Sequence, residues 1–213
     1  EIPKRDWSSD VCSSDLPGAR GESAIARRMA TACLDAGLSV EITEVAPGRP
    51  NVVGVLEGSK PGPALMFCGH MDTVGVAGMA QPFDPVERDG RLYGRGAQDM
   101  KGGLAAMVSA AAVLSREGLD SGRLIVAAVV DEEHASVGAE ALVAKWQADA
   151  AVVTEPTDLN IGIAHKGFEW IAIETRGRPA HGSRPKDGRD AILRMGRVLA
   201  RLEALDQIGR AHV

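Results

Sequence analysis

Apolar runs and amphipathic stretches alternate along most of the chain, and this alternation predicts its secondary structure. In residues 22–36, Ile25, Met29 and Cys33 recur at helical spacing before Gly37, a typical helix stop. Residues 124–130 form a continuous apolar run with the length of a buried strand. We expect helices at 22–36, 102–117, 137–146 and 187–205, and strands at 40–45, 52–56, 64–68, 124–130 and 151–153.

This order of elements indicates an α/β fold. Strands that alternate with helices favour a mostly parallel sheet flanked by helices. The alanine-rich helix 102–117 is apolar on nearly every face, so we expect it to be buried. Residues 81–93 are polar and rich in turn-forming residues, which predicts a loop with a short hairpin.

The pattern changes near Ala164, which predicts a second domain. Residues 168–175 alternate between apolar and polar and predict a strand, and a loop rich in glycine and proline follows them. In helix 187–205 the apolar residues form one face, and the arginines lie mostly off it, as on a solvated surface. We therefore expect one domain over residues 17–164 and the beginning of an α+β domain over residues 165–207.

Both ends of the chain resemble translated sequencing-adapter DNA. Residues 6–16, DWSSDVCSSDL, fit the coding of a common short-read adapter, and Glu1-Ile2 fits the bases upstream of its variable index. Residues 208–213, IGRAHV, fit the opposite adapter, in which a stop codon comes next. We expect residues 1–16 and 208–213 to be foreign segments that pack on nothing specific, and residues 17–207 to be an internal part of a longer protein.

Composition narrows the classes of function. The chain has a net charge of −5, and without its two ends it stays mildly acidic and has no basic block, which argues against a nucleic-acid partner. No apolar run approaches the ~20 residues of a membrane helix, so no membrane partner is expected. Cys33 and Cys68 lie in apolar stretches and favour buried free thiols, which suits a cytoplasmic protein. A signal peptide is testable only with the sequence that precedes residue 17.

Candidate chemistry begins with His70 and Asp72, which follow the apolar run 64–68. Residues two apart in an extended segment point to the same side. One nitrogen of His70 would then bind a metal ion while Asp72 holds the other nitrogen. The alternative is a loop histidine that is hydrogen-bonded to an aspartate.

Further carboxylates follow strand ends or helix starts. Asp99, in the glycine-rich segment GRGAQDMKGG, would either bridge two metal ions or cap the following helix. Glu132 and Glu133 follow the run 124–130, and they either face water or divide the roles of metal ligand and general base. Glu155, before Pro156, is unremarkable alone. An imidazole followed by spaced carboxylates is how a chain builds a hydrolytic metal site.

The motifs HMD, GRGxxDMKGG, DEE after an apolar run, and TEPT occur in one order. Together they resemble the M20 family of zinc peptidases and deacylases, which includes acetylornithine deacetylase, succinyl-diaminopimelate desuccinylase and glutamate carboxypeptidase. The resemblance covers nearly all of residues 17–205. It implies that residues 17–164 are part of a catalytic zinc-binding domain and that residues 165–207 begin a lid and dimerisation domain.

The resemblance implies an activity for the parent protein. It would be a homodimeric two-zinc amidohydrolase, with Co²⁺ or Mn²⁺ as possible substitutes, and it would cleave an N-acyl amino acid or a small peptide. A dipeptidase or exopeptidase of the same family is one alternative, and a catalytically inactive metal-binding fragment is another.

The resemblance also assigns the metal ligands. One zinc would be held by His70, Asp99 and Glu155, and the second by Asp99 and Glu133. The peptide bond between Asp99 and Met100 is expected to be cis.

The remaining site residues would perform the chemistry. Asp72 would orient the imidazole of His70, and Glu132 would be the general acid and base. His181, in RPAHGS, matches a lid-domain histidine of the family that stabilises the oxyanion at the substrate carbonyl, often across a dimer. An ordinary loop histidine is the alternative for His181.

The sequence departs from the family pattern in two places. Ala135 stands where the family often has glycine. The family's further zinc-ligand histidine has no counterpart, because His212 belongs to an end segment and His134 and His165 lie too close to other motifs. We therefore expect the chain by itself to bind zinc weakly, to lack useful hydrolase activity and to be prone to aggregation.

Overall fold

The computed structural model describes residues 21–164 and 172–210, with side chains of the last helix described up to residue 204. The expectations for residues 1–16 and 211–213 lie outside this range. The chain divides into two compact units, one ending at Ile161 and the other beginning at Gly162. Each unit is described by itself.

The first unit is built on a five-stranded sheet of order β1-β2-β6-β3-β7. Strands β3, β6 and β7 run parallel, whereas β1 pairs with β2, and β2 with β6, in antiparallel fashion. The α/β class is confirmed, and the sheet is mixed. The strands are β1 (Ser39–Ala46), β2 (Arg49–Glu57), β3 (Ala64–His70), β6 (Arg123–Val129) and β7 (Ala150–Val153).

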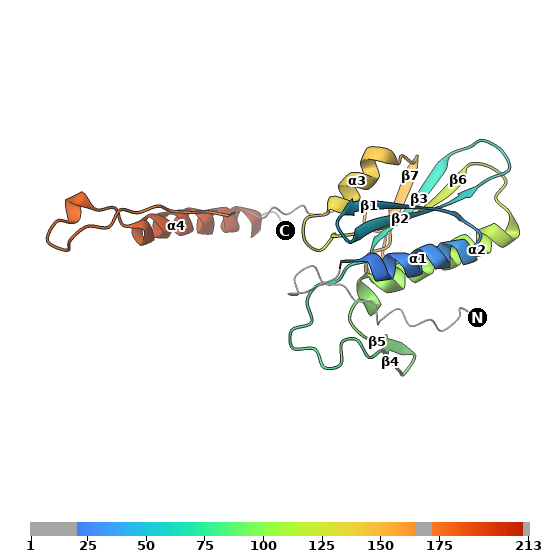
Figure 1. The fold of residues 1–213 in the computed structure, drawn as a ribbon, viewed down its shortest axis with the longest axis horizontal. Coiled ribbons are helices and arrows are strands. Elements are labelled where there is room, and N and C mark those ends of the chain that lie inside the picture. Colours follow the sequence, from blue (N-terminus) through green and yellow to red (C-terminus); the bar gives the residue numbers. More distant parts are fainter. Residues whose placement is uncertain (1–20, 165–171, 211–213) are drawn as a thin grey trace. The chain divides into compact units, whose positions relative to one another are not determined.

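Helices cover both faces of this sheet (Figure 1). Helices α1 (Ser23–Asp35) and α2 (Gly102–Glu117) pack on one face, and α3 (Val137–Lys145) packs on the other. The apolar run of the central strand β6 explains this, because successive side chains of a strand point to opposite faces. Leu124, Val126 and Ala128 belong to the core with α1 and α2, and the residues between them belong to the core with α3.

Helix α2 is buried on one side only, so the expectation of a buried helix is wrong in part. Leu104, Met107 and Ala111 are buried, whereas Ala106, Ala110 and Val113 are exposed. The reason is that α1 and the sheet cover one side of α2, and no described element covers the other. The predicted short hairpin in residues 81–93 is present as β4 (Val86–Arg88) and β5 (Arg91–Tyr93).

The second unit contains helix α4 (Ala191–Arg210) and a short 3₁₀ helix, η2 (Pro185–Asp187). Helix α4 begins later than residue 187 because the carboxylate of Asp190 accepts hydrogen bonds from the amides of Ile192 and Leu193, as a helix cap does. The strand expected at 168–175 lies partly outside the described residues. Its described part, residues 172–175, is not a strand, because it pairs with no other described segment.

Candidate metal centre

Strands β3, β6 and β7 bring the predicted site residues to one edge of the sheet. His70 is the last residue of β3, Glu132 and Glu133 lie just beyond β6, and Glu155 lies just beyond β7. Because these three strands are parallel, their carboxyl ends meet at the same edge, where open α/β sheets bind ligands. Asp99 joins them from the irregular turn η1 (Ala97–Lys101) that precedes α2.

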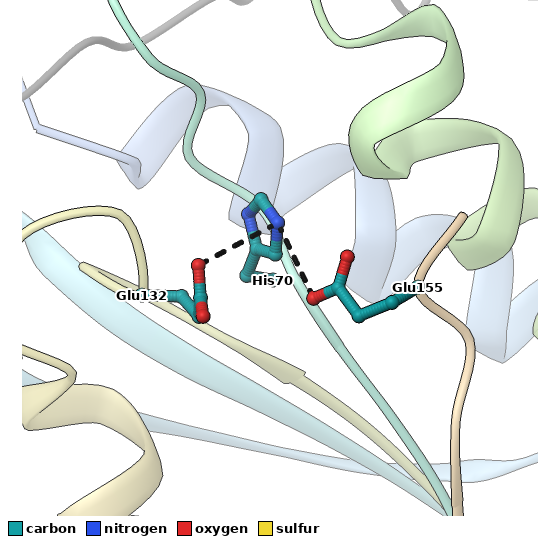
Figure 2. Close-up of side chains that lie close together, drawn as sticks. All are labelled: His70, Glu132 and Glu155. Atoms are coloured by element: carbon teal, nitrogen blue, oxygen red, sulfur yellow. Dashed lines mark ion pairs between the residues drawn. The ribbon is translucent and has the colours of Figure 1, made fainter. Parts of the chain in front are cut away.

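The imidazole of His70 lies at the centre of this group. Its side chain is buried, and its Nε2 atom is 3.0 Å from Asp99 Oδ1, 3.7 Å from Glu155 Oε1 and 3.8 Å from Glu132 Oε2. Figure 2 shows Glu132 and Glu155 approaching the imidazole from opposite sides. The three carboxylates are one-third to one-half exposed. The site therefore presents a buried nitrogen beneath oxygens that solvent reaches.

Asp72 holds two neighbours at once. The Nδ1 atom of His70 lies 3.0 Å from the main-chain oxygen of Asp72 and 3.5 Å from its carboxylate. The two carboxylate oxygens accept hydrogen bonds from the main-chain amides of Glu132, at 3.2 Å, and Glu133, at 3.0 Å. Asp72 thus fixes the backbone of the adjacent glutamates as well as contacting the imidazole.

Asp99 lies in irregular backbone and caps no helix. Its φ and ψ angles are not helical, and neither η1 nor α2 has a side-chain cap. The peptide bond between Asp99 and Met100 is cis, so that expectation is confirmed. The interpretation of Asp99 as a helix cap is wrong, and its carboxylate points at the imidazole of His70 instead.

The electrostatics of the site reflect crowded carboxylates. Burial opposes a charge on His70, but the hydrogen bond and charge of Asp72 and two nearby glutamates outweigh it and raise the pKa of His70 to about 9. Burial, together with neighbouring carboxylates, raises the pKa of Glu155 to about 7 against the attraction of His70. Burial and Asp99 raise the pKa of Glu133 in the same direction. A bound cation would relieve this repulsion.

The donor atoms suit a divalent metal ion. In two groups, each residue offers one ligand atom and these atoms all lie within 4.8 Å of one another: His70, Glu132 and Glu155 form one group, and His70, Asp99 and Glu133 form the other. Imidazole nitrogen and carboxylate oxygen are ligands of zinc, and carboxylate also suits manganese. The predicted first zinc set, with Asp99 and Glu155 together, is split between these groups. The assignment of ligands to individual ions stays a prediction.

His181 lies in the second unit. Its Nδ1 atom is 2.9 Å from the hydroxyl of Ser183, within the same loop. Its predicted role at a substrate carbonyl stays a prediction.

Several buried polar residues beside the site were not found from the sequence. Glu22, Asn51 and Asp131 are buried, and Arg49 is half-buried. Arg49 stands between Gly48 and Pro50, where the pattern indicates a turn. The role of Arg49 becomes visible only from the pairing register of β2 with β6, which brings Arg49 to Asp131.

An imidazole and carboxylates at the carboxyl ends of parallel strands are the donor set that metal-dependent hydrolases use, and comparison identifies the family of this chain. Residues 66–192 match Peptidase family M20/M25/M40, and the chain belongs to this family of amide-bond hydrolases. Metallopeptidases of this family contain divalent metal, so the family implies a metal ion at this site.

Curated relatives are about a third identical to this chain over the aligned residues. The acetylornithine deacetylase of Vibrio campbellii is 32% identical, with 96% of this chain and 55% of that protein covered. The N-formyl-4-amino-5-aminomethyl-2-methylpyrimidine deformylase of Bacillus subtilis is also 32% identical, with 90% and 49% covered. The chain spans about half the length of the curated relatives it matches.

Solved structures share the fold. A tripeptidase from Staphylococcus aureus superimposes with a TM-score of 0.65 at 23% identity, covering 92% of this chain and 53% of that one. The aminopeptidase PepT from Bacillus cereus gives a TM-score of 0.63 at 23% identity, covering 92% of this chain and 54% of that one.

Among the described residues, no helix has the length and apolar character needed to cross a membrane.

Proposed function

We propose that the whole protein is a two-zinc amidohydrolase that removes the acyl group from an N-acyl amino acid. The observation that carries the proposal is the set of carboxylates, from three separate segments, that approach the Nε2 atom of one buried histidine. Four carboxylates, of Asp99, Glu132, Glu133 and Glu155, surround this imidazole, and two divalent ions would balance their charge. Zinc is favoured by the nitrogen and oxygen donors and by the family.

The residues divide the work of hydrolysis. Zinc, when bound, lowers the pKa of water toward neutrality and polarises a carbonyl. Glu132 is the general base that takes a proton from the attacking water and the general acid that returns it to the leaving amine. Its side chain is 42% exposed, so water and substrate reach it. Asp72 holds Glu132 in place through the hydrogen bond that it accepts from the main-chain amide of Glu132.

The names of the relatives favour a deacylase. A deacetylase and a deformylase, each 32% identical, both remove a small acyl group from an amine. A dipeptidase or exopeptidase is the second candidate, because a tripeptidase and an aminopeptidase share the fold. We further propose, from the family resemblance, that the whole protein is a cytoplasmic homodimer in which His181 reaches the substrate carbonyl.

The test is an assay of the full-length protein encoded at the locus, loaded with zinc. Its substrates are N-acetyl amino acids in one arm and dipeptides in the other. Glu132→Gln is expected to lower kcat at least ~100-fold, the usual scale of general acid–base catalysis, while zinc content stays the same. Glu57→Gln, which removes an exposed carboxylate at the end of β2, is the matched control.

The arms separate the outcomes. Turnover of N-acetyl amino acids that is lost in Glu132→Gln supports the deacylase, and turnover of dipeptides alone supports the second candidate. A zinc-loaded protein without turnover of either class contradicts the proposal, as does a Glu132→Gln variant with the kcat of the wild type.

A further inference from the structure

Glu132 and Glu133 sit on a tight loop that is held from several sides. The loop follows β6 and reverses at Asp131, which has a positive φ of 60°. The carbonyl oxygen of Asp131 accepts hydrogen bonds from the amides of Ala135, at 3.2 Å, and Ser136, at 2.6 Å. The conformation of Asp131 therefore decides where the two glutamates point.

Arg49 holds the side chain of Asp131. In the antiparallel pair of β2 and β6, Val52 lies opposite Ala128, and the same register extended by three residues places Arg49 opposite Asp131. The Nη1 atom of Arg49 lies 2.5 Å from Asp131 Oδ1. The Asp131 side chain is only 6% exposed, so solvent screens this ion pair little.

Glu22 backs Arg49 from the other side. Its Oε1 atom lies 3.0 Å from the same Nη1 atom, and its side chain is fully buried. Within the described part of the chain, Oε2 of Glu22 has no hydrogen-bond partner. Burying a carboxylate oxygen without a partner costs free energy. The unpartnered oxygen lowers the free energy of unfolding. The carboxylate nevertheless holds the guanidinium of Arg49 against Asp131.

Asn51 completes the attachment on the same strand. Its side-chain oxygen accepts a hydrogen bond from the amide of Val130, and its nitrogen donates to the carbonyl of Gly138, at 3.1 and 2.7 Å. Val130 lies just before the loop and Gly138 lies just after it. Strand β2 therefore fastens the loop at its two ends through Asn51 and at its turning point through Arg49.

We propose that Arg49, backed by Glu22, is a positioning residue that sets the geometry of Glu132 and Glu133 through Asp131. The inference concerns the loop itself, and its consequence for metal binding rests on the proposed function. The side-chain contacts of Arg49 are with Glu22 and Asp131 and not with His70 or the site carboxylates, so its effect on Glu132 and Glu133 passes through Asp131.

The test compares Arg49→Met with Lys145→Met in the full-length protein encoded at the locus, because the 213-residue chain by itself is expected to be prone to aggregation. Lys145 forms an ion pair with Glu41 on the surface of the same unit. Both variants therefore remove one cation, but Arg49→Met breaks two ion pairs, with Glu22 and Asp131, and Lys145→Met breaks one. The first readout is amide hydrogen exchange, measured by NMR without metal. Arg49→Met should speed exchange at Glu133 and Ser136 at least tenfold, with little change at Met71, whose amide bonds to the end of β6.

Two more variants separate positioning from general damage. Arg49→Lys keeps the cation and should restore most of the protection. Asp131→Asn removes the charge partner while keeping a residue type that tolerates positive φ, and it should speed exchange at the same amides. If Arg49→Met does not fold, the exchange rates of Asp131→Asn decide the question instead. The inference would be overturned if amide exchange in Arg49→Met and Asp131→Asn matched that in Lys145→Met. It would also be overturned if exchange in these two variants rose equally at all amides of β6.

The second readout is the dissociation constant for Co²⁺, from isothermal titration. Arg49→Met is expected to weaken it about tenfold, the lower end of the effect of residues that support metal ligands, and Lys145→Met less than twofold. A wild-type chain that binds no Co²⁺ would overturn the proposed metal centre. Amide exchange at the loop would still decide the role of Arg49, so the two failures are distinguishable.

Discussion

Replacing Glu22 with glutamine should change how the stability of the first unit depends on pH. Burial raises the pKa of Glu22 from 4.5 to about 7, although Arg49 opposes the shift. A raised carboxyl pKa means that the folded state holds the proton more tightly than the unfolded chain does. The stabilisation is present below pH 4.5 and is lost as the pH rises through about 7.

The size of the effect follows from the shift. A shift of one pKa unit corresponds to about 1.4 kcal/mol, so the whole change from below pH 4.5 to above pH 7 is about 3 kcal/mol. Between pH 5 and pH 8, the free energy of unfolding of Glu22→Gln should therefore rise by about 2 to 3 kcal/mol relative to the wild type.

The assay is urea denaturation of both proteins, followed by circular dichroism in metal-free buffer between pH 5 and pH 8. Glu57→Gln, which removes an exposed carboxylate from the end of β2, gives the baseline response to losing one acid. A difference between Glu22→Gln and the wild type that is flat across this range, or that falls as the pH rises, would refute the reasoning.

Two further predictions concern the metal and the loop. Because the pKa values of His70 and Glu155 are raised to about 9 and about 7, protons compete with metal, and zinc affinity should rise steadily from pH 6 to pH 8 in isothermal titration. Gly138→Ala should cost about 1–3 kcal/mol in urea denaturation, because its Cβ atom would lie 2.4 Å from the carbonyl oxygen of Val130. Gly196→Ala, whose Cβ atom would meet nothing within 4 Å, is the control and should be neutral or stabilising, and equal losses in both variants would contradict the steric argument.

Local patterns predicted the elements of the first unit well. The apolar run 124–130 became β6 (Arg123–Val129), and the helix expected at 22–36 became α1 (Ser23–Asp35). Both depend on spacing along the chain, which the sequence contains. The approach of Glu155 to His70 was also expected, because both residues lie at or just beyond the ends of parallel strands that share a carboxyl edge. Asp99 reaches the same imidazole from the turn that precedes α2.

Features that depend on a partner elsewhere in the chain were not predictable. The contact of Arg49 with Asp131 requires the register of β2 against β6, and no local pattern specifies it. The carboxylate of Asp72 lies 3.5 Å from Nδ1 of His70, beside the imidazole that it was expected to orient. It also accepts the amides of Glu132 and Glu133, which no local pattern indicated. The composition of helix α2 predicted a buried helix. Its exposure depends instead on which elements pack against it, and among the described elements α1 and the sheet cover only one of its sides.

The central claim is that His70 and the surrounding carboxylates bind zinc. Its most direct test is a crystal structure of the zinc-loaded chain with anomalous diffraction recorded at the zinc edge. The account predicts an anomalous peak within ~2.0–2.2 Å of His70 Nε2 and of carboxylate oxygens of Asp99 and Glu155. Zinc bound elsewhere, or a site without a peak at saturating zinc, would contradict it.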